Sequence, residues 1–245
     1  PHPDHAERAS ACAITMQLAM EEVNRLNVAR GLPQLQMGIG LNTGEAVVGN
    51  IGSEKRAKYG VVGSAVNLAA RVEACTVGGQ VLLSPFTYER IRQVAEVGPP
   101  LPVEVKGIRE PLLLYELRGL TGDYARRLPA VAADGDCDVS VALPLLCWVI
   151  EGKTVRPEHV KGEVLQLGLR RLEARLDTRL SPLTNVRLRL HYPTLEQDSA
   201  DLYGKVLAAE GQADGCIARI ELTSVDDADQ HILETLLRAS APHHP

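Results

Sequence analysis

Residues 37–73, MGIGLNTGEAVVGNIGSEKRAKYGVVGSAVNLAARVE, contain the pattern that decides the fold of the first half of the chain. Short apolar runs in this stretch predict strands, and polar turn sequences at residues 42–44 and 52–55 separate them. Ser64 can cap a helix that continues to Val72. The stretch therefore predicts successive strands followed directly by a helix.

Two polar side chains interrupt the apolar sequence of that helix. Asn67 and Arg71 are four residues apart, so they project from one face about one turn from each other. An amide can orient a sugar or ring oxygen, and a guanidinium can hold phosphate oxygens. The pair is consistent with a site for a phosphorylated ligand. The alternative is an exposed amide and a surface arginine on an alanine-rich helix.

The whole stretch resembles the second half of a class III adenylate/guanylate cyclase catalytic domain. The shared pattern is GIGxNTGxxxxGNIGSxxRxxY followed by VGxxVNxAARxE, and the resemblance runs from about His5 to about Leu117. It implies that Asn67 orients the nucleotide ribose. It also implies that Arg71 stabilises charge developing at the α-phosphate during cyclisation, as a preorganised cation does at a phosphoryl centre.

The resemblance also places Gly60, Val61 and Gly63 against the substrate, which would be ATP or GTP. Seven residues before Asn67, the family carries an Asp or Thr that helps to read the purine. This chain has Gly60 there, and a glycine has no side chain to hydrogen-bond a base. The choice between adenine and guanine is therefore open, and a degenerate cyclase-like regulatory module is the alternative function.

Cyclases of this family use two Mg²⁺ or Mn²⁺ ions, held by carboxylates in the first half of the domain. We expect those ligands upstream of Pro1 and none in this chain, which begins without an initiator Met. The 245-residue piece alone is then expected to be inactive. Because the family forms its active sites between two such domains, the resemblance also implies a homodimer.

Composition excludes several other classes of protein. The chain has 245 residues, enough for two domains, and 45% of them are hydrophobic. Its net charge of -5 argues against nucleic-acid binding and gives no support for membrane-surface attraction. The sequence contains no P-loop and no dinucleotide fingerprint. The number of cysteines is odd, none lies in a CxxC pair, and no apolar run approaches ~20 residues, which together predict a reduced, cytoplasmic protein.

The flanking sequence predicts further elements of an α+β domain over residues 1–118. An amphipathic helix is expected over residues 4–30, with Asp4 and Glu7 forming a capping-box-like start. Its expected buried face consists of Ala6, Ala9, Ala13, Met16, Met20 and Val23. Strands are expected at residues 80–84, 103–107 and 112–117, with a helix at residues 85–93. The resemblance implies a ferredoxin-like, largely antiparallel sheet, here a truncated one.

The sequence changes character after residue 118. Residues 119–136 lack periodicity and are expected to be a linker. Residues 137–240 contain alternating apolar and polar runs separated by turns, which predict a small antiparallel β-barrel, followed by a C-terminal helix. Over about Cys137 to Arg238 this arrangement is similar to a PilZ domain, a family whose members include sensors of cyclic di-GMP.

The two PilZ motifs that bind cyclic di-GMP are not matched here. RxxxR is replaced by Arg126-Arg127, and [DN]xSxxG by residues 162–168, GEVLQLG. Arg170, Arg171 and Arg175 could suggest a phosphate patch, but a solvated strand face explains them better. We therefore expect no cyclic di-GMP binding and keep a ligand- or partner-binding barrel as a third hypothesis.

Overall fold

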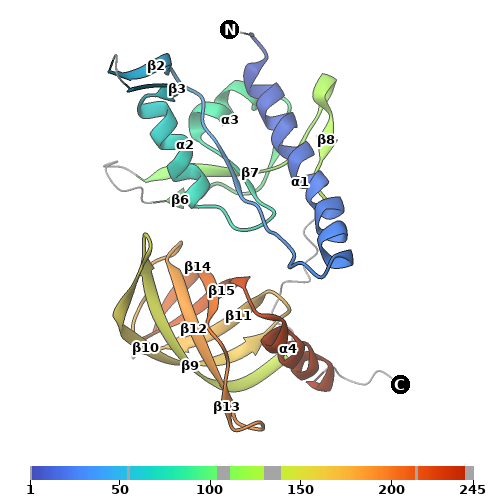
Figure 1. Ribbon diagram of the computed structural model, residues 1–245, viewed down its shortest axis with the longest axis vertical. Coiled ribbons are helices and arrows are strands. Elements are labelled where there is room, and N and C mark those ends of the chain that lie inside the picture. The colour runs from blue at the N-terminus through green and yellow to red at the C-terminus, as the bar shows by residue number, and fades with distance from the viewer. Residues whose placement is uncertain (1, 54–55, 104–110, 130–138, 213–214, 241–245) are drawn as a thin grey trace. The chain divides into compact units, whose positions relative to one another are not determined.

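The computed structural model divides into two compact units, Pro1–Ala130 and Val131–Pro245. Figure 1 shows helices and sheet in the first unit and a barrel with one helix in the second. The structure describes residues 2–53, 56–103, 111–129, 139–212 and 215–240. Within these residues, no helix combines the length and apolar character that a membrane crossing requires.

The first unit mixes helices with short strands. Its elements are α1 (His5–Ala29), β1 (Ile39–Leu41), β2 (Val47–Ser53), β3 (Arg56–Val62), α2 (Ser64–Ala74), β4 (Val81–Leu83), α3 (Pro85–Ile91), β5 (Ala95–Val97), β6 (Leu101–Val103), β7 (Leu112–Leu120), a 3₁₀ turn η1 (Gly122–Tyr124) and β8 (Arg126–Arg127). The order confirms the other predicted strands and helices, whereas residues 104–107 of the strand predicted at 103–107 lie outside the described residues. It adds β5, β8 and the first residues of β6, which the sequence did not predict.

The central sheet has the order β1-β4-β7-β5, and β6 and β8 also pair with β7. Only the β1–β4 pair is parallel among the described strands of this sheet. A largely antiparallel sheet is thus confirmed, while the ferredoxin-like description stays a prediction. The buried cluster of this unit combines β4 and β7 with one face of α1.

Helix α1 buries only part of the predicted face. Ala6 and Ala13 of the predicted stripe are buried, but Ala9, Met16 and Val23 are exposed, and Ser10 and Ile14 are buried without having been predicted. All of the buried residues lie in the first half of the helix. The capping box is also absent, since Asp4 occupies the N-cap position without a side-chain cap bond.

Asp4 instead ties the start of α1 to the end of the unit. Its Oδ2 accepts a hydrogen bond from the Tyr124 hydroxyl at 2.5 Å, and this bond holds the pKa of Asp4 below its usual value. Gly119 and Leu120 pair with Arg127 and Arg126, so the sheet continues beyond the expected domain end at residue 118. The expected linker at residues 119–136 is therefore wrong for its first part, and residues 130–136 lie outside the described residues.

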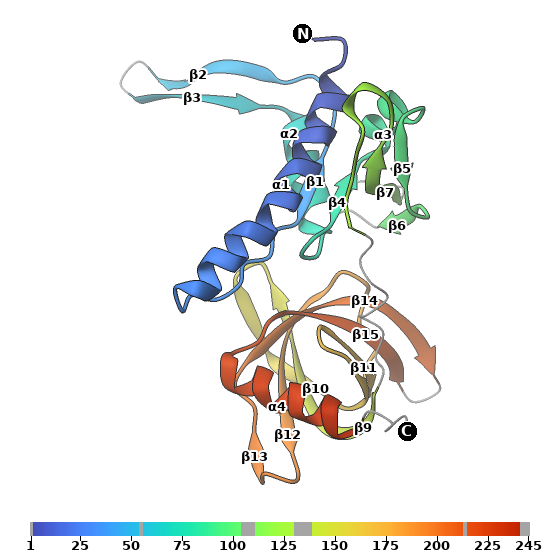
Figure 2. The same cartoon turned by 90° about the vertical axis from the view of Figure 1, so that its right-hand side faces the viewer.

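Strands β2 and β3 form a separate two-stranded sheet. Figure 2 shows them as a ribbon that extends away from the central sheet. The strands were predicted, but their apolar side chains are not buried: Val47 is 66% exposed and Tyr59 is 71% exposed. A ribbon with this composition is expected to need a covering surface, because an isolated hairpin is marginally stable in water.

The second unit consists of long antiparallel strands and a terminal helix. Its elements are β9 (Val139–Glu151), β10 (Thr154–Leu167), β11 (Arg171–Leu176), β12 (Asn185–Tyr192), β13 (Gln197–Asp198), β14 (Leu202–Gln212), β15 (Gly215–Ser224) and α4 (Asp227–Ser240). The neighbours run β12-β14-β15-β11-β10-β9, and β9 pairs with β12 again. This closure confirms the predicted barrel, and the PilZ-like description of it stays a prediction.

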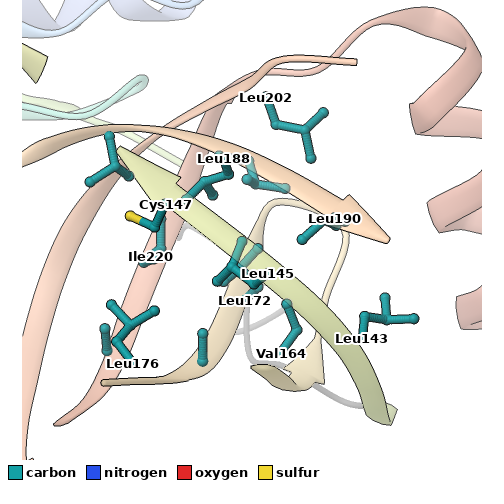
Figure 3. Packing of buried hydrophobic residues seen from close by; sticks show 14 of the residues in the cluster. Leu143, Leu145, Cys147, Val164, Leu172, Leu176, Leu188, Leu190, Leu202 and Ile220 are labelled. Carbon is teal, nitrogen blue, oxygen red and sulfur yellow. The ribbon is translucent and has the colours of Figure 1, made fainter. Parts of the chain in front are cut away.

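The interior of the barrel is filled by alternate residues of each strand. On β12, for example, Val186, Leu188, Leu190 and Tyr192 are buried. Figure 3 shows the side chains of several strands converging in one cluster, with the Cys147 thiol among them. Leu233 of α4 is buried against the same cluster, so the terminal helix covers part of it. Period-two burial on a closed sheet explains why the alternating sequence pattern predicted this domain.

Helix α4 is also held by a buried polar group. Asp229 is buried, and its carboxylate accepts hydrogen bonds from the Tyr192 hydroxyl at 2.9 Å and from the Ala200 amide at 2.8 Å. Burial and this bond together raise the pKa of Tyr192 far above its usual value. The Asp226 carboxylate accepts from the Asp229 amide, so it caps the start of the helix.

Candidate functional site

The predicted site lies on α2 and on the strand before it. Helix α2 begins at Ser64, but the N-cap position belongs to Gly63, and Ser64 makes no side-chain cap bond. Gly63 has φ +155°, and a Cβ there would lie 3.2 Å from the Glu45 carbonyl oxygen. A glycine at this position therefore lets β3 turn directly into α2.

Asn67 and Arg71 both lie on α2 and both are exposed. Within the described residues, neither side chain has a hydrogen-bond or ion-pair partner. Arg71 lies in the last turn, where the helix dipole favours a cation. The structure thus places an amide and a guanidinium one turn apart on an accessible helix face, as the sequence predicted.

Gly60 and Val61 lie on β3, opposite Gly49 and Val48 of β2. A Cβ added to Gly60 would meet Ile51 Cδ1 at 3.7 Å, which is ordinary contact, so packing does not require glycine there. The missing side chain therefore leaves an open strand surface before α2. Whether Asn67, Arg71, Gly60, Val61 and Gly63 share one bound nucleotide remains a prediction.

Metal ligands were expected outside this chain. Among the described residues, no group of three or more His, Cys, Asp or Glu side chains gathers in a way that could hold a metal ion. The position of the metal ligands stays a prediction.

The arginines singled out in the sequence are engaged elsewhere. Arg126 donates to Thr15 and Arg127 to Glu96, both within the first unit. They therefore belong to the sheet of that unit and not to the barrel, and they bind different partners, as adjacent residues of a strand do.

Two arginines of the barrel, Arg171 and Arg175, form ion pairs with carboxylates of the same unit. Arg171 Nε lies 2.7 Å from the buried Glu221 carboxylate, and Arg175 pairs with Glu163 at 3.4 Å. Each carboxylate offsets the charge of the arginine beside it. The interpretation as a solvated strand face is supported, and a convergent phosphate patch is not.

Sequence reasoning missed the contacts between β1 and α2. The Asn42 side chain donates to the Ala65 carbonyl of α2 at 2.9 Å. A Cβ on Gly40 would overlap the end of α2, and a Cβ on Gly38 would overlap Thr76 just after the helix. The signal was present, because glycines at alternate strand positions indicate the close approach of another backbone.

Comparison with known proteins supports the same family. Residues 2–119 match the family model described as the adenylate and guanylate cyclase catalytic domain. The chain is 33% identical over 118 residues to adenylate cyclase 1 of Rhizobium meliloti (strain 1021), covering 47% of this chain and 18% of that protein. It is 30% identical over 138 residues to guanylate cyclase soluble subunit beta-2 of Rattus norvegicus, covering 55% and 20%.

A solved structure gives a similar result. The crystal structure of the guanylyl cyclase Cya2 superposes with a TM-score of 0.50 and 46% sequence identity, covering 53% of this chain and 66% of that chain. The chain spans about a fifth of the length of the curated relatives named above. The comparisons therefore support a cyclase catalytic domain over residues 2–119.

Proposed function

We propose that the first unit, whose residues 2–119 match the adenylate and guanylate cyclase catalytic domain, is the C-terminal half of a class III catalytic domain. The complete protein would convert a nucleoside triphosphate to a 3',5'-cyclic nucleotide and pyrophosphate. The observation that carries this proposal is the exposed Asn67–Arg71 pair on α2, within the residues that match the family.

Each residue of the pair has a separate role in this proposal. The Asn67 amide orients the ribose, and the Arg71 guanidinium stabilises negative charge that develops at the α-phosphate. Both groups are free of protein partners within the described residues, so they are available to a ligand. A cation placed before the reaction stabilises the transition state without reorganisation, which is the main source of catalysis at phosphoryl centres.

The remaining parts of the catalytic centre come from outside this chain in our proposal. Two Mg²⁺ or Mn²⁺ ions would be held by carboxylates outside the described residues, as the resemblance to the cyclase family implies. When bound, such ions supply Lewis-acid chemistry at the phosphates. The named relatives include both adenylate and guanylate cyclases, and Gly60 offers no side chain to choose between the bases.

A homodimer through the first unit completes the proposal. The β2–β3 ribbon exposes Val47, Tyr59 and Val61, and an apolar surface of this kind is stabilised by a second protein surface. We propose that a second copy of the same unit covers it. Dimerisation is typical of the cyclase family, which supports the choice of a second copy as the partner.

A degenerate regulatory module is the competing function, and Gly60 is the observation that favours it. Arg71→Ala in the complete protein separates the two hypotheses. Because the guanidinium acts mainly on the transition state, kcat should fall about 100-fold, corresponding to ~3 kcal/mol, with a smaller change in KM. Formation of cyclic AMP and cyclic GMP is measured with manganese and each triphosphate.

Arg92→Ala is the matched control for this experiment. Arg92 is an exposed arginine at the C-terminal end of α3, paired with Glu89 at 3.2 Å. Its removal should leave kcat unchanged. An unchanged kcat in Arg71→Ala would show that Arg71 is a surface residue, and a complete protein without cyclase activity would favour the regulatory module.

A further inference from the structure

We propose that residues 38–44 form a seat that fixes α2 on β1, and that Asn42 is a positioning residue for Asn67 and Arg71. The seat is a property of the fold and stands on contacts within the first unit. Its catalytic consequence rests on the function proposed above, so the two are tested by separate measurements.

Glycines make the first part of the seat. A Cβ on Gly40 would lie 2.2 Å from the Glu73 amide nitrogen and 2.8 Å from the Val72 carbonyl carbon. A Cβ on Gly38 would lie 1.8 Å from Thr76 Oγ1. Gly40 belongs to β1 and Gly38 directly precedes it. The last turn of α2 and Thr76 after it therefore lie directly on the backbone of residues 38–40.

Asn42 makes the second part, at the other end of the helix. Its Nδ2 donates to the Ala65 carbonyl oxygen in the first turn of α2, at 2.9 Å. Gly44 allows the approach, since a Cβ there would lie 2.7 Å from Ala65 Cβ. The helix is thus held at both ends, at Ala65 and at Glu73, and the proposed catalytic pair lies between these points.

The Asn42 side chain has an unfavourable feature that its Nδ2 donor must offset. Asn42 Oδ1 is buried without a hydrogen-bond partner among the described residues. A buried acceptor without a partner is unfavourable, and an apolar residue of similar size would avoid that cost. An amide at this place is therefore explained by what its nitrogen does, which is to hold the first turn of α2.

The next residue anchors the seat to the rest of the unit. Thr43 Oγ1 lies 3.0 Å from Thr87 Oγ1 of α3, and the Thr87 amide donates to Ser84 Oγ. The Ser84 amide in turn donates to the Leu41 carbonyl at 2.9 Å. Consecutive residues Asn42 and Thr43 therefore connect one turn to two helices, and movement of α2 relative to the sheet is restricted.

This arrangement matters because the proposed catalytic side chains have no other support. Asn67 and Arg71 are exposed and without partners among the described residues, so their position depends on the backbone of α2. A displacement of about 1 Å in a catalytic group can lower a rate about 100-fold. The seat is therefore the element of this chain that sets where the amide and guanidinium stand.

The catalytic consequence is tested with Asn42→Asp in the complete enzyme. The substitution keeps the shape of the side chain, removes the donor and places a carboxylate oxygen against the Ala65 carbonyl. We expect kcat to fall at least about 10-fold with little change in KM, because positioning is lost but binding groups remain. Asn42→His, whose Nδ1–H can replace the amide donor, should restore most of kcat.

Asn24→Asp is the matched control. Asn24 of α1 also bridges a helix to a loop, since its Nδ2 donates to the Leu35 carbonyl at 2.9 Å and its Oδ1 accepts from the Leu35 amide at 2.7 Å. Asn24→Asp adds the same negative charge and removes the same amide donor as Asn42→Asp, but the two bonds of Asn24 are to Leu35 and not to α2. This variant should keep kcat within about 2-fold of the unsubstituted enzyme.

The seat itself is tested on the 245-residue chain by hydrogen–deuterium exchange. Asn42→Asp should speed exchange of α2 amides at least about 10-fold, while exchange of the buried first half of α1 stays unchanged and shows that the first unit is folded. Asn24→Asp should leave α2 exchange unchanged. Unchanged α2 exchange in Asn42→Asp overturns the seat. Faster α2 exchange together with unchanged kcat overturns the positioning role, and a complete protein without activity overturns the proposed function alone.

Discussion

The two units of this protein enclose their apolar residues to very different degrees. The barrel closes on itself through the β9–β12 pair, and its inward side chains fill one continuous cluster. The first unit has a smaller buried cluster and exposes apolar side chains along β2 and β3 and along the second half of α1. The filled interior of the barrel indicates a self-sufficient scaffold, although single apolar side chains such as Leu169 and Leu195 are exposed on its unit. The exposed apolar surfaces of the first unit indicate where other protein surfaces are expected to bind.

The largest expected effect tests the proposal that the metal ligands lie outside this chain. The purified 245-residue chain, mixed with manganese and ATP or GTP, should form no cyclic nucleotide above background, because in our proposal the carboxylates that hold the metal ions belong to another part of the complete protein. The complete protein is the positive control. Turnover by the chain that Arg71→Ala abolishes would show that the ligands have been placed wrongly and that the first unit is sufficient.

The next effect tests the difference in packing directly. Leu188→Ala in the barrel should lower the free energy of unfolding by about 3 kcal/mol, since Leu188 is fully buried in the cluster of Figure 3. Leu113→Ala makes the same change on β7, where the side chain is 43% exposed, and should cost less than ~1 kcal/mol. Urea unfolding followed by circular dichroism gives both values. Equal losses would contradict the comparison.

A smaller expected effect is a loss of barrel stability at high pH, caused by a buried thiol. Burial raises the pKa of the Cys147 thiol to about 12, so the folded state favours the neutral thiol. An unfolded thiol titrates near pH ~8.5, so this stability is complete below that pH and is lost as pH rises toward 12. At pH 10 the loss should be about 2 kcal/mol. Tyr192, whose pKa is also raised, adds to the loss above pH ~10.

Cys147→Ala provides the control for the pH dependence. The variant is less stable at every pH, but the free energy of unfolding between pH 8 and pH 10 should fall less steeply than in the unsubstituted chain. Parallel curves of unfolding free energy against pH for the two chains would contradict the prediction. They would show that the pKa of the Cys147 thiol does not differ between the folded and unfolded states.

The last prediction is that cyclic di-GMP does not bind to this chain. Titration of the chain with cyclic di-GMP in a calorimeter should give no saturable heat, because Arg126 and Arg127 belong to the first unit and Arg171 and Arg175 are paired with carboxylates. A ligand with two phosphates normally needs several free, convergent donors. Saturable binding in the micromolar range would make the barrel a sensor and remove its description as a closed scaffold.

The sequence predicted what periodicity and short motifs determine. The alternation of Val186, Leu188 and Leu190 gave a strand with one buried face, and residues 64–72 gave α2 with Asn67 and Arg71 on one face. The barrel was predicted from such patterns without knowledge of which strands pair with each other. Local rules sufficed because each strand carries its own alternation regardless of which strand it pairs with.

Other features depended on tertiary contacts that no local pattern reports. The stripe predicted on α1 is buried at Ala6 and Ala13 but exposed at Ala9, Met16 and Val23, because the surface that the helix packs against decides which residues are buried. The apolar run of β2 and β3 predicted strands but could not show that they leave the sheet. Asn42 looked like a turn residue, and its bond to Ala65, which is 23 residues away, appears only in the folded unit.

The closure of the barrel determines when it can fold during synthesis of the chain. Leu145 on the first strand pairs with Leu190 on the fourth, and the ring is complete only when β15 lies between β14 and β11. Pairings between distant residues form late and slowly, since a long loop must close first. A ribosome must therefore release nearly all of residues 139–224 before the ring can close. Until then its apolar strands have free edges, and the growing chain is most exposed to aggregation.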